Sequence, residues 1–385
     1  MVPEQDQDQE KRILFIVNED WFFYSHRLAL AKACIADGWR VSVATRVNAH
    51  DDAIKSHNIH LIPSRMTRGA ISLSALWHEI LTVLQLACVI RREKPAVMHL
   101  VGLKPVIFGW LATVLLPRPV TVNALTGMGY IFTSAKFDVR VIRTLIKWML
   151  KRALHRRKSY LITQNKRDAA GLLNGGIAAK ERTLTIFGSG VDTAEFCPSP
   201  EPQGAVRITY VGRMLRDKGV EDLVRAAHEL KQRRYDFELR LVGGTDPGNP
   251  THISEEELRE WDSEEFISWL GYRDDVDAVW RETNIAVLPS YREGMPMSLL
   301  EASASGRPLV STRVQGCEEL VEHGFNGYLV EPNDWRNLAN ALEELMLDAE
   351  KRREMGAAAR VRVENRFDQK TVISSTLRLY ERAMG

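Results

Sequence analysis

The sequence predicts an α/β protein made of two Rossmann-like domains that face a cleft. Short apolar runs alternate with amphipathic helical segments along nearly the whole chain. The runs are apolar on both faces, which is typical of parallel strands covered by helices on both sides. At 385 residues, the chain is too long for one ordinary domain, and its 45% apolar and 26% charged residues are typical of a globular protein.

The first half of the chain contains six expected strands and two clear helices. A helix is predicted over Leu28–Asp37, because its apolar spacing ends at Gly38. A second helix opens near Ser72 or Ser74 and ends before Pro95. The apolar runs predict strands at Arg12–Asn18, Val41–Thr45, Leu61–Pro63, Ala96–Val101, Val120–Ala124 and Tyr160–Gln164.

The second half repeats this alternation. Helices are predicted over Val220–Gln232 and Ser298–Ser305, and the charged tail from Asp334 onward is also predicted to be helical. Six further apolar runs predict the strands of a second parallel sheet, at Arg207–Val211, Glu238–Val242, Ile267–Leu270, Ile285–Pro289, Leu309–Thr312 and Gly327–Val330.

A proline-rich segment predicts where the two domains meet. Residues 197–204 read Cys-Pro-Ser-Pro-Glu-Pro-Gln-Gly, a composition typical of a linker. We therefore predict an N-terminal domain over residues 1–196 and a C-terminal domain over residues 206–370. Residues 371–385 are predicted to form a helix that returns to the first domain.

The composition limits the cellular compartment and the classes of binding partner that we expect. The net charge of +2 selects no class of partner when taken over the whole chain. The four cysteines are too far apart in sequence for a zinc knuckle or a redox pair, and the first residues do not resemble a secretory leader. The longest apolar run, residues 106–117, is too short to cross a bilayer. We therefore expect a cytoplasmic protein with free thiols and no metal or prosthetic group.

Residues 289–301 read Pro-Ser-Tyr-Arg-Glu-Gly-Met-Pro-Met-Ser-Leu-Leu-Glu and predict a strand, a tight loop and a helix that starts near Met297. The free N–H groups and the dipole at a helix start favour an anion. Glu293 lies on the loop, and Glu301 lies about one turn inside the helix. Two acids near a helix start are commonly ordinary solvated residues. Because apolar neighbours surround Glu301, we favour a role for both acids in accepting sugar hydroxyls.

Residues 210–219, which read Tyr-Val-Gly-Arg-Met-Leu-Arg-Asp-Lys-Gly, form a second junction between a strand and a helix. Arg213 and Lys218 are on the same loop, at the carboxyl end of a predicted parallel strand, where both could reach a diphosphate. The alternative is that they are surface cations balanced by Asp217 and Glu221.

Together these segments resemble glycosyltransferase family 4, whose members are retaining enzymes of the GT-B fold. The resemblance covers most of residues 205–335, in the order of the family's motifs. It is carried by Gly212-Arg213 with Lys218-Gly219, by Leu270-Gly271-Tyr272-Arg273-Asp274-Asp275, by the Glu293-x7-Glu301 spacing, by Gly306-Arg307-Pro308, and by Gly316-Cys317-Glu318-Glu319.

The resemblance implies a role for each matching position. Arg213 and Lys218 would bind the donor diphosphate and stabilise its charge as it leaves, without a metal. Glu293 would contact the donor sugar, and Glu301 would bind the ribose hydroxyls. The remaining binding positions are the loop glycine Gly212, the backbone of Gly294, Met295, Pro296 and Met297, and the segment Gly271, Tyr272 and Arg273, which would lie against the base.

The first domain resembles a subgroup of bacterial surface-polysaccharide transferases, through residues 13–18, 21–27 and 125–130. It departs from the wider family in two places: the glycine loop after the first strand is replaced by an aromatic run, and the His-x-His pattern is reduced to His99-Leu100-Val101. His99 and His26 are both candidates for a catalytic residue. For His99, a hydrogen-bonded histidine in the core is the competing interpretation.

Residues Lys136–Lys158 are strongly basic, with nine Lys or Arg and a single acid. Five of these cations recur at spacings of three or four and share a helical face: Lys136, Arg140, Arg143, Lys147 and Lys151. Apolar surface is supplied by Phe137, Ile142, Leu145, Ile146, Trp148, Met149 and Leu154, and the combination suits an anionic membrane. The alternative is a helix with an apolar core side and a basic solvent side. The subgroup's use of polyprenyl-diphosphate-linked acceptors favours peripheral attachment to the inner face of the cytoplasmic membrane. Nucleic acid is not expected, because no binding motif accompanies the charge.

These observations predict a retaining hexosyltransferase that uses a nucleoside-diphosphate sugar. UDP is the expected nucleotide, while GDP and ADP are not excluded. The acceptor would be a carbohydrate or a lipid-linked glycan in the synthesis of surface polysaccharide. Two alternatives remain from the sequence: an epimerase of nucleotide sugars, and a subunit that binds nucleotide sugars without catalysis.

Overall fold

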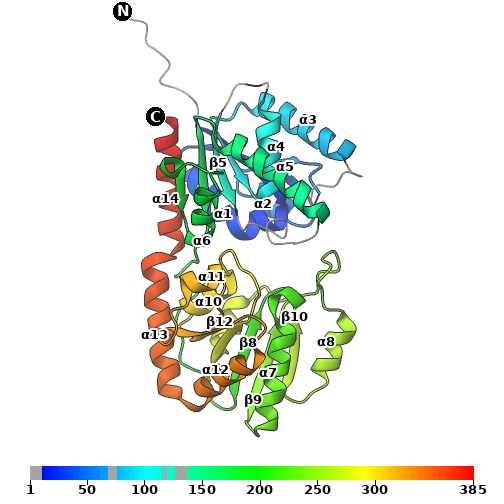
Figure 1. Ribbon diagram of the computed structural model, residues 1–385. Helices are drawn as coiled ribbons and strands as arrows, with labels where there is room; N and C mark the ends of the chain where they lie inside the picture. Colours follow the sequence, from blue (N-terminus) through cyan, green and yellow to red (C-terminus); the bar gives the residue numbers. More distant parts are fainter. Residues whose placement is uncertain (1–10, 68–75, 115, 117–118, 126–136) are drawn as a thin grey trace, which may run out of the picture. The chain divides into compact units, whose positions relative to one another are not determined.

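The computed structural model describes residues 11–67, 76–114, 116, 119–125 and 137–385 (Figure 1). The chain divides into two compact units, which we call the first unit (Met1–Ser189 with Ile373–Gly385) and the second unit (Gly190–Val372). The proline-rich segment at residues 197–204 lies in the second unit.

The first unit is built on a parallel sheet in the order β3-β2-β1-β4-β5-β6-β7. Its central strands are buried along their whole length because helices cover both faces. The strands are β1 Arg12–Glu19, β2 Arg40–Arg46, β3 His60–Pro63, β4 Val97–Val101, β5 Val120–Leu125, β6 Ser159–Thr163 and β7 Thr183–Thr185.

The helices of the first unit pack in two layers (Figure 1). Leu14 and Ile16 of β1 belong to one core cluster with buried residues of α3, α4 and α5. Phe15, which points to the opposite face, packs on Phe23 of α1 and on His99. The helices are α1 Asp20–Ala36, α2 Asp51–Lys55, α3 Leu76–Glu93, α4 Leu103–Ala112, α5 Phe137–Leu154, α6 Lys166–Asn174 and α14 Gln369–Met384, whose first turn still belongs to the second unit.

The second unit contains a parallel sheet in the order β10-β9-β8-β11-β12-β13. Its strands are β8 Val206–Val211, β9 Phe237–Val242, β10 Ile267–Gly271, β11 Ile285–Leu288, β12 Leu309–Thr312 and β13 Gly327–Val330. Its helices are α7 Val220–Gln232, α8 Glu255–Asp262, α9 Val276–Arg281, α10 Met297–Ala304, α11 Gln315–Leu320, α12 Trp335–Leu347 and α13 Ala349–Arg366, and the short 3-10 helix η3 spans Arg216–Lys218.

The predicted fold class is confirmed: each unit is a parallel sheet flanked by helices. The prediction that the first helix begins at Leu28 was wrong, because α1 begins at Asp20 and includes the aromatic run, whose Phe23 is fully buried. The edge strand β7 was missed, since its three half-buried residues form no apolar run. The predicted start of α3 near Ser72 or Ser74 lies outside the described residues, as does most of the loop at 125–130.

No helix in the described part of the chain combines the length and the apolarity that crossing a bilayer requires.

Candidate functional site

Two loops of the second unit meet at the point where its strand order reverses. Strand β8 lies between β9 and β11, so the loops that follow β8 and β11 leave the same edge of the sheet in neighbouring positions. In open α/β sheets, this switch point is where ligands bind. The backbone N–H of Tyr291 donates to the carbonyl of Asp217 at 2.9 Å and joins the two loops.

Gly219 shows how closely these loops approach. Its φ is +71°, and a β-carbon there would lie 2.1 Å from the carbonyl oxygen of Pro289. Only glycine fits this position, because any side chain would both strain the backbone and push the loops apart. The glycine of the predicted Lys218-Gly219 pair therefore sets the spacing between the two loops.

A third loop, which follows β9, is joined to the loop that follows β8. The N–H of Met214 donates to the carbonyl of Gly244 at 3.1 Å, and the N–H of Ile253 donates to that of Met214 at 3.0 Å. A β-carbon on Gly243 would fall 1.8 Å from the carbonyl oxygen of Gly212. This close contact brings Asp246 against Arg213.

The two predicted cations are each held by an acid. A guanidinium N–H of Arg213 donates to Asp246 at 2.7 Å, and the ammonium of Lys218 donates to Glu293 at 2.5 Å. In both pairs the cation is the more exposed partner and the acid is largely buried. Such pairs hold the cations in place while leaving them open to a stronger anion from solvent.

Tyr210 fixes the backbone that carries Arg213. Its hydroxyl donates to the carbonyl of Arg213 at 2.8 Å, and a β-carbon on Gly212 would lie 2.8 Å from that same hydroxyl. Burial, with added repulsion from Glu293, raises the pKa of Tyr210, so the phenol remains a donor at any physiological pH.

The helix start predicted near Met297 is confirmed. Helix α10 spans Met297–Ala304 and follows Pro296, and no side chain caps its first turn. Helix α11 supports the loop that precedes α10, because the N–H of Gly316 donates to the carbonyl of Glu293 at 3.2 Å. A β-carbon on Gly316 would lie 2.5 Å from the carbonyl oxygen of Gly294, so this contact also requires glycine. The uncapped N–H groups of α10 form a site suited to an anion.

Glu301, on α10, is a perturbed acid. Burial raises its pKa to about 7, repulsion from Glu195 adds to the shift, and a hydrogen bond from the Trp280 indole at 3.4 Å opposes it. Strongly shifted acids next to a binding loop are typical of functional sites.

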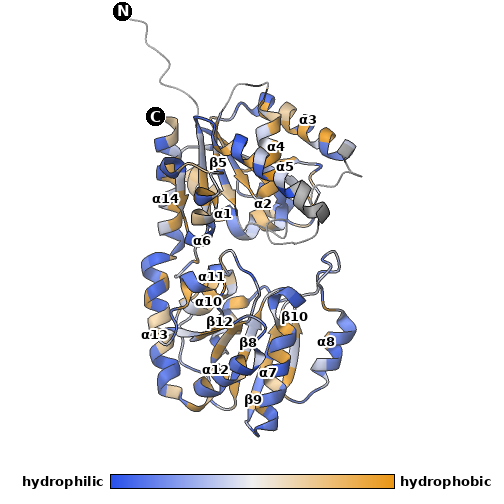
Figure 2. Cartoon of the chain, in the orientation of Figure 1, coloured by the Kyte–Doolittle hydropathy of each residue, from blue (hydrophilic) through white to orange (hydrophobic). Residues whose placement is uncertain are grey.

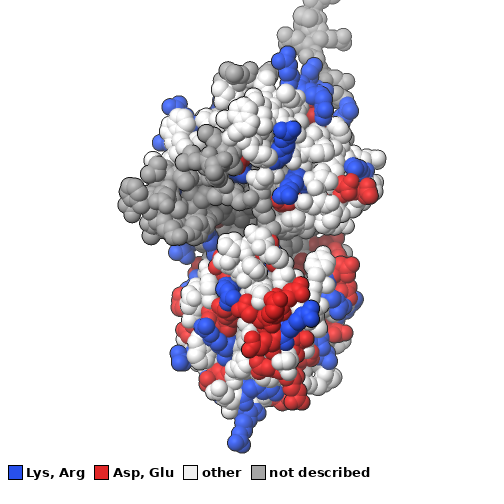
Figure 3. Space-filling view, turned by 90° about the vertical axis from the view of Figure 1, so that its right-hand side faces the viewer, with Lys and Arg blue, Asp and Glu red and all other residues white. Residues whose placement is uncertain are grey.

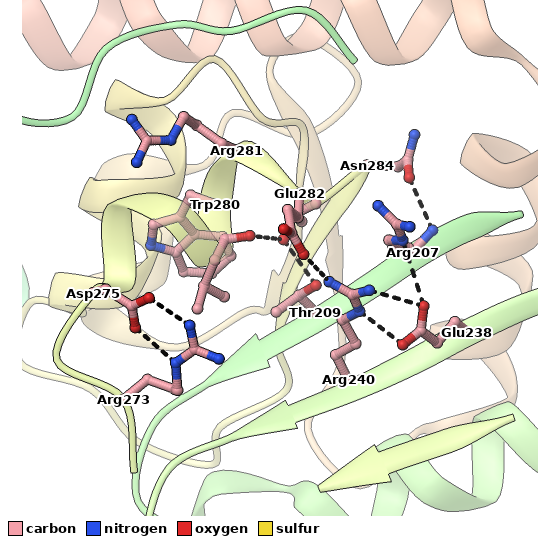
Figure 4. Close-up of polar contacts among 12 residues, drawn as sticks. Arg207, Thr209, Glu238, Arg240, Arg273, Asp275, Trp280, Arg281, Glu282 and Asn284 are labelled. Carbon is pink, nitrogen blue, oxygen red and sulfur yellow. Dashed lines mark hydrogen bonds and ion pairs between the residues drawn. The ribbon is translucent and has the colours of Figure 1, made fainter. Parts of the chain in front are cut away.

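The segment Gly271-Tyr272-Arg273 begins at the last residue of β10 and lies beside the loop after β9. The N–H of Gly243 donates to the carbonyl of Gly271 at 2.7 Å, and the Tyr272 side chain is 79% exposed. Figure 4 shows the Arg273 guanidinium turned toward Asp275, with its Nε donating to that carboxylate at 2.6 Å. An exposed ring at this edge of the sheet is available for stacking.

The two candidate histidines lie in the first unit. His99, on β4, is 1% exposed; its Nδ1 shares a hydrogen bond with the Tyr380 hydroxyl, its ring stacks on Phe15, and its Nε2 has no partner among the described atoms. Burial, with repulsion from Arg27, lowers its pKa. The structure therefore supports the interpretation of His99 as a core histidine.

His26, on α1, is half-buried and stacks on Phe22 with ring centroids 4.2 Å apart. Its Nδ1 shares a 2.6 Å hydrogen bond with the hydroxyl of Ser25. Burial and the charge of Arg27 lower its pKa to about 3, so the ring is neutral at physiological pH. Within the residues that the structure describes, no group of three or more His, Cys, Asp or Glu is arranged to hold a metal ion.

Comparison with known proteins decides the family. The family described as "Glycosyl transferase 4-like" matches residues 12–165, and the one described as "Glycosyl transferases group 1" matches residues 192–362. The two matches cover most of both units. The chain belongs to the glycosyltransferases.

Two relatives illustrate the range of this family. A D-inositol 3-phosphate glycosyltransferase of Pseudarthrobacter chlorophenolicus is 32% identical over 236 residues, which is 58% of this chain but only 56% of that relative. The N,N'-diacetylbacillosaminyl-diphospho-undecaprenol alpha-1,3-N-acetylgalactosaminyltransferase of Campylobacter jejuni is 26% identical over 72% of this chain and 74% of its own length.

A solved structure extends the likeness to the whole fold. HepE (Alr3699) of Anabaena, in complex with UDP and glucose, matches with a TM-score of 0.76 and 19% identity, covering 95% of this chain and 98% of that chain. The likeness confirms the predicted GT-B class of this glycosyltransferase.

Sequence reasoning missed three residues of the glycosyltransferase's candidate site. Asp246, Trp280 and Gly316 contact predicted residues, but the first two come from segments to which no motif was assigned. Gly316 was quoted as part of a motif, yet it was given no role. The one signal in the sequence for Asp246 is the glycine pair at 243–244, since glycines after a buried strand indicate a close backbone approach.

Proposed function

We propose that this glycosyltransferase moves a sugar, with retention at the anomeric carbon, from a UDP-sugar to a carbohydrate or a polyprenyl-diphosphate-linked acceptor in surface-polysaccharide synthesis. The observation that carries the proposal is the pair of acid-held cations, Arg213 and Lys218, beside the uncapped start of α10 at the switch point of the second unit.

Donor binding exchanges one set of ion pairs for another. In the structure the acids Asp246 and Glu293 neutralise the two cations. A diphosphate carries more charge than either carboxylate and accepts several hydrogen bonds at once, so it takes over Arg213 and Lys218. The cations need little rearrangement, because the loops that carry them are already joined.

The exchange also prepares the sugar contact. Once Lys218 turns to the diphosphate, the Glu293 carboxylate is free to accept hydrogen bonds from hydroxyls of the donor sugar. Negative charge then develops on the diphosphate as the bond to the anomeric carbon breaks. Arg213, Lys218 and the α10 N–H groups stabilise this charge. Because these groups stabilise the charge of the departing diphosphate, transfer does not require a divalent metal in this proposal.

The nucleoside lies toward β10 and α10 in this proposal. The Tyr272 ring, exposed at the end of β10, stacks on the base, and Arg273 lies beside it. Glu301 accepts hydrogen bonds from the ribose hydroxyls. The Anabaena structure, which holds UDP, supports UDP as the first nucleotide to test.

The choice of acceptor is supported by the family. The Campylobacter relative is named for transfer to an undecaprenyl-diphosphate-linked sugar. The resemblance of the first unit to surface-polysaccharide transferases points to the same class of acceptor.

The test is a transfer assay with purified protein, a panel of UDP-, GDP- and ADP-sugars, and lipid extract from bacterial membranes. We expect one donor to be consumed only with extract present, and NMR of the product to show the anomeric configuration of the donor. Activity should persist when EDTA is added. Isomerised donor without any acceptor, or binding without turnover, would replace the proposal with an epimerase or a binding subunit.

A further inference from the structure

A cavity of about 210 Å³ lies at the amino edge of the first unit's sheet, where β1 and β2 begin and α3 ends. Its lining includes Arg12, the first residue of β1, Arg40, the first residue of β2, and Arg92, in the last turn of α3. Open α/β sheets bind their substrates at the carboxyl edge, which is the opposite one. None of the residues placed in the candidate site lines this cavity, so its charge has a separate cause.

Arg12 and Arg40 are direct neighbours across the sheet. The parallel register of β1 and β2 pairs Arg12 with Arg40. Paired residues of adjacent strands lie about 4.8 Å apart and direct their side chains to the same face. Like charges in such positions repel each other. The fold therefore holds two guanidinium groups together at the cavity, and a ligand with negative charge would relieve their repulsion.

The one acid among the described residues of the lining, Glu93, is already engaged. Its carboxylate accepts hydrogen bonds from Arg92 Nε at 3.0 Å and from the Ser42 hydroxyl at 2.9 Å, and it contacts His60 Nδ1 at 3.2 Å. Burial acts to raise the pKa of Glu93, but these hydrogen bonds together lower it, so the carboxylate is ionised at physiological pH. Glu93 thus balances Arg92 and is not available to Arg40.

Arg40 is exposed, and no acid in the described part of the chain lies within ion-pair distance of its guanidinium. Helix α3 is hydrophobic along most of its length in Figure 2, and its last turn carries Arg91 as well as Arg92. Arg91 offsets the partial negative charge that a helix end contributes. Figure 3 shows Lys and Arg gathered toward the top of the first unit, with few Asp or Glu between them. Since three guanidinium groups face one carboxylate in the described lining, the cavity carries an excess of positive charge.

The size of the cavity selects a small ligand. A volume of about 210 Å³ is that of about seven liquid waters and is smaller than the roughly 300 Å³ at which pockets for drug-sized ligands begin. The planar donor fork of arginine matches the oxygens of a phosphate. A phosphate with at most a small group attached therefore fits both the charge and the volume.

From these observations we infer that the cavity binds the phosphate group of a small soluble metabolite. Arg12 and Arg40 contact the phosphate, and the Arg92–Glu93 pair forms a fixed wall beside it. The bound phosphate offsets the repulsion between the two arginines and ties β1 to β2. This site takes a ligand other than the sugar donor and lies in the other unit, so it goes beyond the proposed function.

The test is calorimetry of the full chain with inorganic phosphate and with glucose 6-phosphate, at constant ionic strength and without sugar donor or acceptor. Its failure would leave the proposed transfer untouched. We expect both compounds to bind and glucose alone to give no heat. Equal affinities would make free phosphate the ligand, whereas tighter binding of glucose 6-phosphate would show that the cavity also holds the sugar. Arg40→Gln should bind either compound roughly tenfold more weakly, because it loses a charge-assisted hydrogen bond.

The matched control is Arg46→Gln, which removes the exposed arginine at the other end of β2 and should bind as the unchanged protein does. Arg40→Glu places a carboxylate opposite Arg12. Added phosphate should therefore raise the melting temperature of the unchanged protein but not that of Arg40→Glu. Circular dichroism checks that each variant is folded.

The donor site of the second unit is the competing place for a phosphate, and Arg213→Ala separates the two. Binding that persists in Arg213→Ala and weakens in Arg40→Gln would support the cavity. Binding that is lost in Arg213→Ala and unchanged in Arg40→Gln would overturn the inference. So would the absence of binding by either compound.

Discussion

The candidate site of the second unit and the buried surroundings of His99 in the first unit show two ways in which a fold uses charged and polar side chains. In the second unit, Arg213 and Lys218 lie on loops, partly exposed, each held by an acid. In the first unit, His99 lies inside the sheet layer, bonded to Tyr380 and stacked on Phe15. A site that must exchange ligands needs groups that solvent reaches, whereas a buried histidine ties elements together. Under the proposed function, this difference in exposure separates Arg213 and Lys218, which would contact the donor, from His99, which packs in the core.

The largest effect on turnover is expected from Arg213→Ala, which tests whether the exposed loop cations act on the donor. If the loop cations stabilise the departing diphosphate, turnover should fall about a hundredfold or more. The matched control is Arg216→Ala on the same loop, because Arg216 pairs with Glu221 and Glu257 instead. Steady-state kinetics of both variants checks the prediction. Similar losses in the two variants would mean that charge on the loop, rather than the position of Arg213, matters.

The pH dependence of nucleotide affinity tests Glu301. Because burial raises its pKa to about 7, the carboxyl is mostly protonated at pH 6 and ionised at pH 8.5. Ribose hydroxyls donate to the ionised form, so affinity should tighten as the pH rises through 7, by up to about tenfold per unit below that pKa. Glu301→Gln should remove this dependence. Calorimetry at the two pH values measures it, and a dependence that survives in Glu301→Gln would assign the titration to another group.

The same shift predicts a change in stability. The folded protein keeps a proton on Glu301 between the unfolded value of about 4.5 and the folded value of about 7, so stability falls as the pH rises through this window. Glu301→Gln avoids that loss. We expect its melting temperature to exceed that of the unchanged protein at pH 8, by roughly 2–4 °C for each kcal/mol of stability regained, and to match it at pH 4. Differential scanning calorimetry decides the point, and an equal difference at both pH values would contradict it.

A smaller effect is expected from Asp246→Asn. The amide keeps the shape of Asp246 but weakens the charge-assisted hydrogen bond that holds Arg213. Turnover should fall by a factor of about 3 to 10, as expected for a residue that positions another. The double variant Asp246→Asn/Arg213→Ala should be no slower than Arg213→Ala alone, because Asp246 acts by holding Arg213. Additive losses would show that Asp246 acts separately.

The smallest effect on turnover is expected from His99→Phe. The substitution leaves the buried Tyr380 hydroxyl without its partner and should destabilise the first unit by about 1–3 kcal/mol. Turnover well below the melting temperature should change little. Tyr380→Phe/His99→Phe, which removes both polar groups, should recover part of the stability. A loss of turnover comparable to that of Arg213→Ala, with unchanged stability, would instead make His99 a catalytic residue.

Burial of His99 also has a pH signature. Its folded pKa lies below the ordinary 6.5, so the unfolded chain binds the extra proton first, and the stability that the neutral ring contributes is lost as the pH falls below about 6.5. His99→Phe should lose less stability between pH 7 and pH 5 than the unchanged protein does. Thermal melts at the two pH values measure this difference.

The sequence predicted the parts of this fold whose physical cause is local. Helix α7 and strands β12 and β13 were predicted with the bounds observed, because each has a clear apolar period between glycines or polar turns. The loops at Arg213 and Glu293 were found because glycine and charge share short segments there. A core position for His99 was one of the two interpretations that the sequence allowed, but its partner could not be predicted, since Tyr380 is 281 positions away. The exposure of Trp77 on α3 could not be predicted either, because the apolar period of a helix does not tell which of its apolar sides is covered.

The central claim, that the switch point of the second unit binds the nucleoside diphosphate of a sugar donor, is tested most directly by calorimetry. UDP, GDP and ADP would be titrated into the unchanged protein, Arg213→Ala, Glu301→Ala and Arg216→Ala. The account predicts that one nucleotide binds to the unchanged protein and to Arg216→Ala, and at least roughly tenfold more weakly to the other two. Binding of no nucleotide, or equal affinity in all four proteins, would contradict it.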